Sequence, residues 1–237
     1  MRIDNFFFEK KFWFSTRLFV PLQRKTLEMM SSLKESNAYR QQLKGRIMET
    51  ALKAFTKHGI RAVKMDDIAS ELSISKRTVY EVYDDKEQLL FEVLKTYDGT
   101  RRARLAEYAQ QNHHVMDIIL EAYRMKLKEM RSVNPRFYTD IAMYPKLSQH
   151  IKNNNERTRE EFVAFLQRGV EEGYLRADVN YQMIPYMLEA IGQYVLTSKL
   201  LDNYSIEEIF SNYFLVSLRG LCTPKGLAVI EETLKSL

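Results

Sequence analysis

Four side chains that can contact nucleic acid lie close together in the first half of the sequence. They are Lys76, Arg77, Thr78 and Tyr80, and no acidic residue lies among them. Lys and Arg can donate hydrogen bonds to guanine edges or to phosphates, and Thr can contact a thymine methyl group or a phosphate. A short helix that presents these residue types from its first turn suits insertion into a DNA major groove.

Two short helices joined by a tight turn would hold these side chains in place. The residues Met65–Leu72 predict the first helix, because apolar side chains fall on one face and two aspartates lie in the first turn. Ser73-Ile74-Ser75 then interrupts the pattern. Ser75 is a good N-cap for a second helix, which we expect from Lys76 to about Tyr83.

This stretch resembles the DNA-binding signature of the tetracycline-repressor (TetR) family. It reads I-A-x-x-L-S-I-S-K-R-T-V-Y-x-V-Y-x-x-K-x-x-L, from Ile68 to Leu89. The commoner family form has Ala-Gly-Val-Ser in the turn, where this chain has Leu72-Ser73-Ile74-Ser75. Because Ser replaces Gly, we infer that the turn does not depend on a positive φ. The motif and the preceding helix cover roughly Tyr39 to Leu94, and beyond them the resemblance is one of length and helical pattern.

The resemblance also implies which residues contact DNA. Members often carry Thr where this chain has Lys64, and the lysine could itself reach a phosphate. Tyr80 and Lys86 match family positions that contact phosphates. The expected DNA-binding residues are therefore Lys64, Ser75, Lys76, Arg77, Thr78, Tyr80 and Lys86. The alternative is a helical hairpin whose basic face is merely solvated.

Composition and charge favour an all-α protein with a basic end. The 237 residues are 45% apolar and include only 8 Gly and 5 Pro, few of the residues that interrupt helices. Residues 39–64 hold seven Lys or Arg against the single acid Glu49, which suits a footprint for phosphates. The lone Cys222 excludes an internal disulfide and fits a reducing compartment, so we expect a cytoplasmic protein.

We predict three segments along the chain. Residues 1–37 form an N-terminal extension, residues 38–92 a three-helix helix-turn-helix domain, and residues 93–237 a helical ligand-binding and dimerisation domain. The extension is rich in aromatic and basic residues but too short and too charged for a transmembrane helix. It could be a membrane-surface anchor or an arm that touches DNA. We favour a third interpretation, in which translation begins at Met29 or Met30, and we do not expect membrane binding.

Two helices of the C-terminal domain carry more apolar positions than one core-facing side requires. We expect them at Tyr181–Leu201 and Ile206–Cys222. The excess predicts a four-helix interface made by two helices from each subunit of a homodimer. The expected interface residues are Ile191, Tyr194, Tyr213 and Phe214. Plain core packing is the alternative for part of this apolar surface.

Aromatic side chains in the same domain suggest a pocket. We expect it to involve Tyr123, Phe137, Tyr138, Tyr144, Phe162 and Phe165. A buried Tyr needs a partner for its hydroxyl, and a wholly packed core would be expected to use Phe or Leu instead. The prediction is a mainly apolar pocket for an aromatic or amphipathic molecule. Ordinary core packing explains the same residues equally well.

The sequence lacks the motifs that would indicate several other classes of function. Neither G-x-S-x-G nor a glycine-rich phosphate loop occurs, and no group of His and Cys has metal-ligand spacing. We therefore expect no enzyme, no metal and no cofactor. The resemblance implies a repressor whose dimer occupies a palindromic operator in double-stranded DNA and leaves it when a small-molecule inducer binds. The alternative is a regulator whose C-terminal domain binds a protein partner or acts without an inducer.

Overall fold

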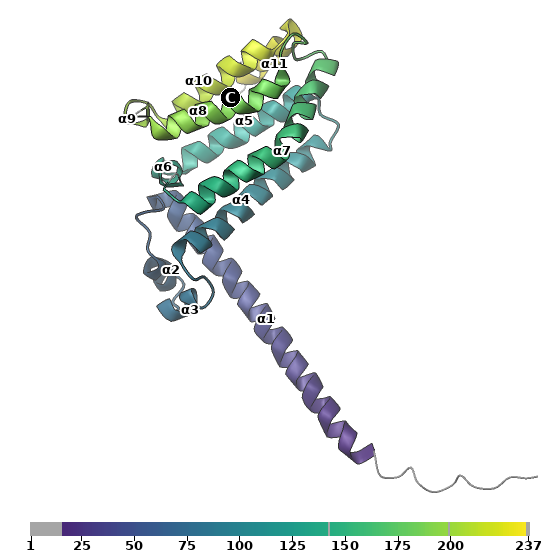
Figure 1. The fold of residues 1–237 in the computed structure, drawn as a ribbon, viewed down its shortest axis with the longest axis vertical. Helices are drawn as coiled ribbons and strands as arrows, with labels where there is room; N and C mark the ends of the chain where they lie inside the picture. The colour runs from purple at the N-terminus through teal and green to yellow at the C-terminus, as the bar shows by residue number, and fades with distance from the viewer. Residues whose placement is uncertain (1–15, 142, 199, 236–237) are drawn as a thin grey trace, which may run out of the picture. The chain divides into compact units, whose positions relative to one another are not determined.

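The computed structural model describes residues 16–141, 143–198 and 200–235, and every regular element in these ranges is a helix (Figure 1). The chain divides into two units after Arg46, and each is described by itself. The described part of the first unit belongs to α1 (Thr16–His58). This helix begins well before Ala38, where we expected it, because the added residues are mostly good helix formers. The extension of residues 1–37 stays a prediction, and its first 15 residues lie outside the described ranges.

The second unit opens with a small three-helix core. It consists of the end of α1, α2 (Met65–Glu71) and α3 (Lys76–Tyr80). The side chains that fill this core are 0–1% exposed and are Ile47, Phe55, Ile68, Val79 and Tyr83. The second predicted helix is shorter than expected. It ends at Tyr80, and the N–H of Tyr83 still donates to the carbonyl of Val79, which folds the tyrosine ring back into the core.

The body of the second unit is built around α5 (Val115–Ser132), which packs against α4, α7, α10 and α11. The other helices are α4 (Lys86–Ala109), α6 (Arg136–Ile141), α7 (Pro145–Glu171), α8 (Ile184–Thr197), α9 (Leu200–Asn203), α10 (Ile206–Leu221) and α11 (Pro224–Lys235), and a 3₁₀ turn, η1 (Tyr181–Met183), precedes α8. The helix predicted at Tyr181–Leu201 is thus divided. Ser198 adopts an extended conformation (φ −87°, ψ 169°), so α8 stops at Thr197.

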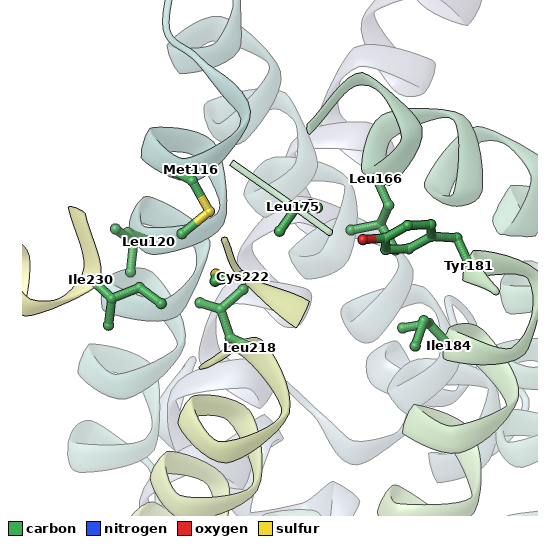
Figure 2. Packing of buried hydrophobic residues seen from close by; sticks show 9 residues of the cluster. All are labelled: Met116, Leu120, Leu166, Leu175, Tyr181, Ile184, Leu218, Cys222 and Ile230. Atoms are coloured by element: carbon green, nitrogen blue, oxygen red, sulfur yellow. The ribbon is translucent and has the colours of Figure 1, made fainter. Parts of the chain in front are cut away.

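Apolar side chains from several of these helices meet in one cluster (Figure 2). Its buried members are Met116, Leu120, Leu166, Leu175, Tyr181, Ile184, Leu218, Cys222 and Ile230. Gly169 allows α7 to approach this cluster closely, because an added Cβ would lie 2.7 Å from a methyl carbon of Leu175. Burial raises the pKa of the Cys222 thiol to about 11, so this thiol stays protonated near neutral pH. None of the helices in the described ranges is long and apolar enough to span a membrane.

Candidate nucleic-acid interface

Two backbone hydrogen bonds close the turn between α2 and α3. The N–H of Ser73 donates to the carbonyl of Ser70 (3.0 Å), and the N–H of Ile74 donates to the carbonyl of Ala69 (3.0 Å). This pattern ends a helix with one residue in the left-handed region, and Ser73 has a φ of 53°. Our inference that the turn does not depend on a positive φ is therefore wrong. Ser73 adopts that conformation despite its Cβ, at a cost of roughly 1–2 kcal/mol.

The start of α3 is held by a side-chain cap. The hydroxyl of Ser75 accepts the N–H of Thr78 (3.1 Å), and the two hydroxyl oxygens lie 2.8 Å apart. Ser75 has the extended conformation of an N-cap, as the sequence predicted. The hydroxyls of Ser75 and Thr78 therefore hold each other in the free protein. The contact between them uses only one of the two hydroxyl hydrogens, so the other hydroxyl keeps a hydrogen that it can donate to a phosphate.

The two basic residues at the start of α3 each have an acidic neighbour. The Lys76 amine lies 2.9 Å from the Asp66 carboxylate of α2, and this hydrogen bond, followed by the opposite charge, raises the pKa of Lys76. The Nε of Arg77 donates to Oε1 of Glu81 (2.9 Å). The Arg77 side chain is nevertheless 88% exposed. Both basic side chains lie at the surface. Their ion pairs with Asp66 and Glu81 are weak because they are exposed, so bound DNA would displace them.

The remaining predicted DNA contacts differ in how accessible they are. The Tyr80 ring is 41% exposed on α3, and Lys64 is exposed immediately before α2, where its backbone N–H donates to Asp67 (2.7 Å). Lys86 is half-buried instead. Its amine lies 3.4 Å from the carbonyl oxygen of Arg61, and burial lowers the pKa of Lys86. The lysine therefore contacts the protein backbone in the absence of DNA.

The residues predicted to line a ligand pocket lie in different surroundings. The Tyr123 ring is 3% exposed and stacks on Phe214, with ring centroids 4.7 Å apart. Phe137 is buried on α6, with the neighbouring Tyr138 ring edge-on to it at 5.5 Å. The other three are partly buried: Phe162 and Phe165 pack against the cluster of Figure 2, and Tyr144 follows α6 near Asp140. The structure thus brings together Phe137 and Tyr138, and it places Tyr123 in a separate aromatic stack.

Two of the four predicted interface residues are exposed, and the other two are partly buried. Tyr194 on α8 is 58% exposed and Tyr213 on α10 is 37% exposed, whereas Ile191 and Phe214 are partly buried. Further exposed apolar side chains are Tyr186, Met187 and Leu188 on α8, Val216 on α10, and Met183 in the 3₁₀ turn η1 before α8. An apolar groove of about 360 Å³ runs along α9 and α10 and includes Tyr204 and Tyr213. In the view of Figure 1, α8 and α10 lie on the side of the body away from α4.

The acidic partners of α3, the recognition helix expected to enter the DNA major groove, were not predicted from the sequence. Glu81 could have been found, because Arg77 and Glu81 are four residues apart, the spacing of neighbours on a helix. The pairing of Lys76 with Asp66 spans ten residues and depends on the turn geometry, so no local pattern indicates it. Asp140, a buried carboxylate whose Oδ2 accepts the backbone N–H of Arg61 (2.8 Å), was not predicted either.

The helix α3 is capped, exposed and basic, and it belongs to a three-helix core that is followed by a helical body. This combination defines a helix-turn-helix DNA-binding regulator. Residues 47–93 match the family model described as bacterial regulatory proteins, tetR family. This match confirms the resemblance seen in the sequence: residues 47–93 form a DNA-binding domain of the kind found in TetR-family transcriptional regulators.

Relatives and solved structures agree with this fold. The HTH-type transcriptional repressor KstR2 of Mycobacterium tuberculosis is 24% identical over 147 residues, which are 60% of this chain and 73% of that protein. A Saccharomonospora viridis protein solved in complex with choline superposes with a TM-score of 0.60 at 18% identity, covering 77% of this chain and 99% of that one. The fatty acid degradation regulator FadR of Bacillus halodurans has a TM-score of 0.56 at 15% identity, covering 74% and 94%.

Proposed function

We propose that this regulator is a homodimeric repressor of the cytoplasm that occupies a palindromic operator and leaves it when a small apolar or amphipathic molecule binds to its body. The observation that carries the DNA-binding part is the exposed recognition helix. Arg77 and Tyr80 stand at the surface of α3, and the Ser75 cap fixes the first turn that would enter the groove. KstR2 is named a transcriptional repressor, and we extend this role to the present chain as part of the proposal.

The exposed apolar residues of α8 and α10 support the homodimer. Large apolar side chains that are about half exposed, as on α8 and α10, are uncommon on a monomer when they form a patch, and such patches mark interaction sites. A second copy that presents the same two helices would cover them with a self-complementary surface. Gly192 lies exposed on α8, and a Cβ there would meet nothing within 4 Å, so another helix can approach closely at this position.

The residues expected to bind a ligand differ in how they are packed. Tyr123 and Phe137 are packed as core residues, and this packing favours the alternative of a partner protein or of action without an inducer. The partly buried Tyr144 favours a small molecule, because its hydroxyl can adjust to a polar group of a ligand. The Tyr138 hydroxyl already donates to Oε1 of Glu129 (2.8 Å). The two solved structures are named for choline and for fatty acid degradation, so the shared fold does not itself set the ligand.

Selection of DNA by the full chain tests the proposal. The protein should enrich palindromic duplexes from genomic fragments and from a randomised library, and footprints should show two half-sites one helical turn or a multiple of it apart. A thermal-shift screen with cationic dyes, bile-acid-like compounds and fatty-acyl compounds then identifies binders. Binders that stabilise the protein and release the selected duplex support the inducer. Enrichment of no sequence would reject the operator, and stabilising compounds that leave DNA affinity unchanged would reject the inducer.

A further inference from the structure

The first turns of α4 and α7 lie side by side (Figure 1). Pro145 opens α7, and Leu147 in its first turn is only 1% exposed. One turn later, the ring of His150 packs edge-on against Phe91 of α4, with ring centroids 4.6 Å apart. Lys146 and His150 are four residues apart, so both side chains lie on the face of α7 that meets α4. The start of α7 is therefore fixed beside the start of α4, the helix that follows α3.

Lys146 approaches α4 at the residue directly after Lys86. Its amine lies 3.9 Å from Oε2 of Glu87, which is too far for a hydrogen bond. The Lys146 side chain is 77% exposed. An ion pair of this length and exposure is weak, and an ammonium group has three hydrogens to donate. Lys146 can therefore turn to another anion at little cost.

Glu87 carries a charge that the protein compensates only in part. Its Oε1 is buried and has no hydrogen-bond partner among the residues that the structure describes. A buried carboxylate oxygen without a donor is unfavourable. Glu87 would also repel a phosphate held by Lys86, the residue before it. The positive charge of Lys146 offsets this repulsion, so Lys146 favours the approach of DNA at this position.

A third basic residue lies near the same place. The Lys86 amine is 3.4 Å from the carbonyl oxygen of Arg61. Burial raises the pKa of Tyr144, and the charges of Arg61 and Glu87 also act on its hydroxyl, two residues before Lys146. Arg61, Lys86 and Lys146 therefore form one basic surface, to which the segment before α2, the start of α4 and the start of α7 each contribute one residue.

The basic side chains of this surface reach the solvent more fully than the neighbouring acids. Arg61 and Lys146 are exposed. The Glu87 side chain is 24% exposed, and Asp140 is only 8% exposed and accepts the backbone N–H of Arg61 (2.8 Å). An approaching polyanion thus meets the cations first.

We propose that Lys146 contacts the DNA backbone next to the phosphate bound by Lys86, so that the DNA interface extends from the helix-turn-helix domain onto the body. A duplex fits this surface because it carries one negative charge per roughly 1.7 Å of its axis, and lysine contacts to phosphates do not depend on the base sequence. The inference rests on the proposed function, in which Lys86 turns to a phosphate. It adds a residue that lies 60 positions beyond Lys86 and outside residues 47–93.

The salt dependence of binding tests the contact in the full chain. Fluorescence anisotropy on a scrambled duplex gives the affinity between 50 and 200 mM salt. Lys146→Ala should reduce the slope of log affinity against log salt concentration by about one, so the loss of affinity over this range should shrink by roughly threefold. Lys146→Arg keeps the charge and should keep the slope. Thermal unfolding first establishes that each variant is folded.

Lys152→Ala is the matched control for the slope. Lys152 is exposed on the same helix, but six residues further on it points to a different side. Its replacement should leave the slope unchanged. Lys86→Ala combined with Lys146→Ala should reduce the slope by about two, because the two lysines contact separate phosphates. An unchanged slope in folded Lys146→Ala, or a double variant that matches Lys86→Ala alone, would overturn the proposal.

A cleavage experiment measures how close Lys146 lies to DNA. Lys146→Cys and Lys152→Cys are each labelled with an iron chelate that cuts nearby DNA. The native Cys222 is buried and its thiol stays protonated, so the label attaches at the new position. On a duplex that the wild-type protein selects, the label at position 146 should cut the backbone beside each half-site, and the label at position 152 should cut much less.

Equal cutting from positions 146 and 152 would contradict the contact. Two failures can be told apart. A wild-type protein that binds no duplex would reject the proposed function and this inference together. A wild-type protein that binds DNA, with a slope that Lys146→Ala leaves unchanged, would reject this inference alone.

Discussion

The Nε of Arg77 lies 2.9 Å from Oε1 of Glu81, one helical turn further along the chain. Both side chains are more than half exposed, so the ion pair is weak and exchangeable. A guanine edge or a phosphate can take the place of Glu81, and the carboxylate then repels the DNA backbone. We therefore expect the pair to lower the affinity of the protein for every DNA sequence, and we expect the arginine to make the base contact.

Arg77→Ala and Glu81→Gln should consequently act in different ways. Arg77→Ala should change the base preference in selection from a randomised library, because it removes a side chain that can read guanine. Glu81→Gln should raise affinity for all duplexes by less than roughly fivefold and leave the preference intact. Fluorescence anisotropy on a selected and a scrambled duplex separates the two effects. An unchanged preference in Arg77→Ala would remove this residue from direct readout.

Lys86 gives a second prediction about DNA. Its amine rests near the carbonyl of Arg61 in the free protein, and we expect it to turn to a phosphate in the complex. Lys86→Ala should weaken binding to selected and scrambled duplexes about equally. It should also reduce the slope of log affinity against log salt concentration by about one. Lys128→Ala, on an exposed site of α5, is the control and should leave the slope unchanged. A slope equal to that of wild type would show that Lys86 only supports the fold.

The strained turn gives a prediction about stability. Ser73→Gly should stabilise the protein by about 0.5–1 kcal/mol, because glycine adopts a φ near 53° without a Cβ clash and this gain exceeds its greater entropy when unfolded. Ser70→Gly is the matched control. Ser70 lies within α2, where glycine is a poor helix former, so this change should destabilise by about 0.5 kcal/mol. Urea unfolding at one protein concentration measures both, and destabilisation by Ser73→Gly would contradict the assigned strain.

Local signals explain what the sequence predicted correctly. Ser75 was recognised as an N-cap from its own type and the residues that follow, and the motif from Ile68 to Leu89 identified the DNA-binding helices. The positive φ of Ser73 was not predicted, because glycine is the usual occupant of such a position. The two hydrogen bonds of the turn require that φ, and together they outweigh the local preference of serine.

Contacts between residues far apart in the chain could not be predicted from local sequence patterns. Asp140 bonds to Arg61 across 79 residues, and Tyr123 stacks on Phe214, which belongs to a helix much later in the chain. A run of aromatic residues on one helix predicts an apolar face but not its partner. Tyr123 was therefore a pocket candidate in the sequence and is a packed core residue in the structure. The DNA-binding and ligand-binding assignments remain predictions that the experiments above test.

The exposed face of α8 and α10 predicts the effect of an added charge. Tyr194→Glu and Tyr213→Glu should each convert dimers to monomers in sedimentation at micromolar concentration, because a charge buried in an apolar interface has no partner. Ile151→Glu is the control. Ile151 is 42% exposed on α7, outside this face, so its replacement should leave the dimer intact. Wild-type protein that sediments as a monomer would reject the dimer itself.

Alkaline pH should weaken the fold through Tyr97. Burial, followed by the charge of Glu129, raises the pKa of Tyr97 from 10.0 to about 12. The folded state therefore holds this proton more tightly than the unfolded state does. The contribution to stability is fully present below pH 10, falls as the unfolded chain ionises, and is lost as the pH rises through 12. The free energy of unfolding should consequently decrease across this window.

Tyr97→Phe removes the ionising group, so its free energy of unfolding should fall less steeply between pH 10 and 12 than that of the wild type. Burial raises the pKa of Tyr138 as well, and the single substitution should therefore reduce the slope without abolishing it. Tyr39→Phe, at a ring that is 64% exposed, is the control and should keep the wild-type slope. Urea unfolding at fixed protein concentration measures all three proteins. Equal slopes for Tyr97→Phe and wild type would show that Tyr97 ionises as readily in the folded protein as in the unfolded chain.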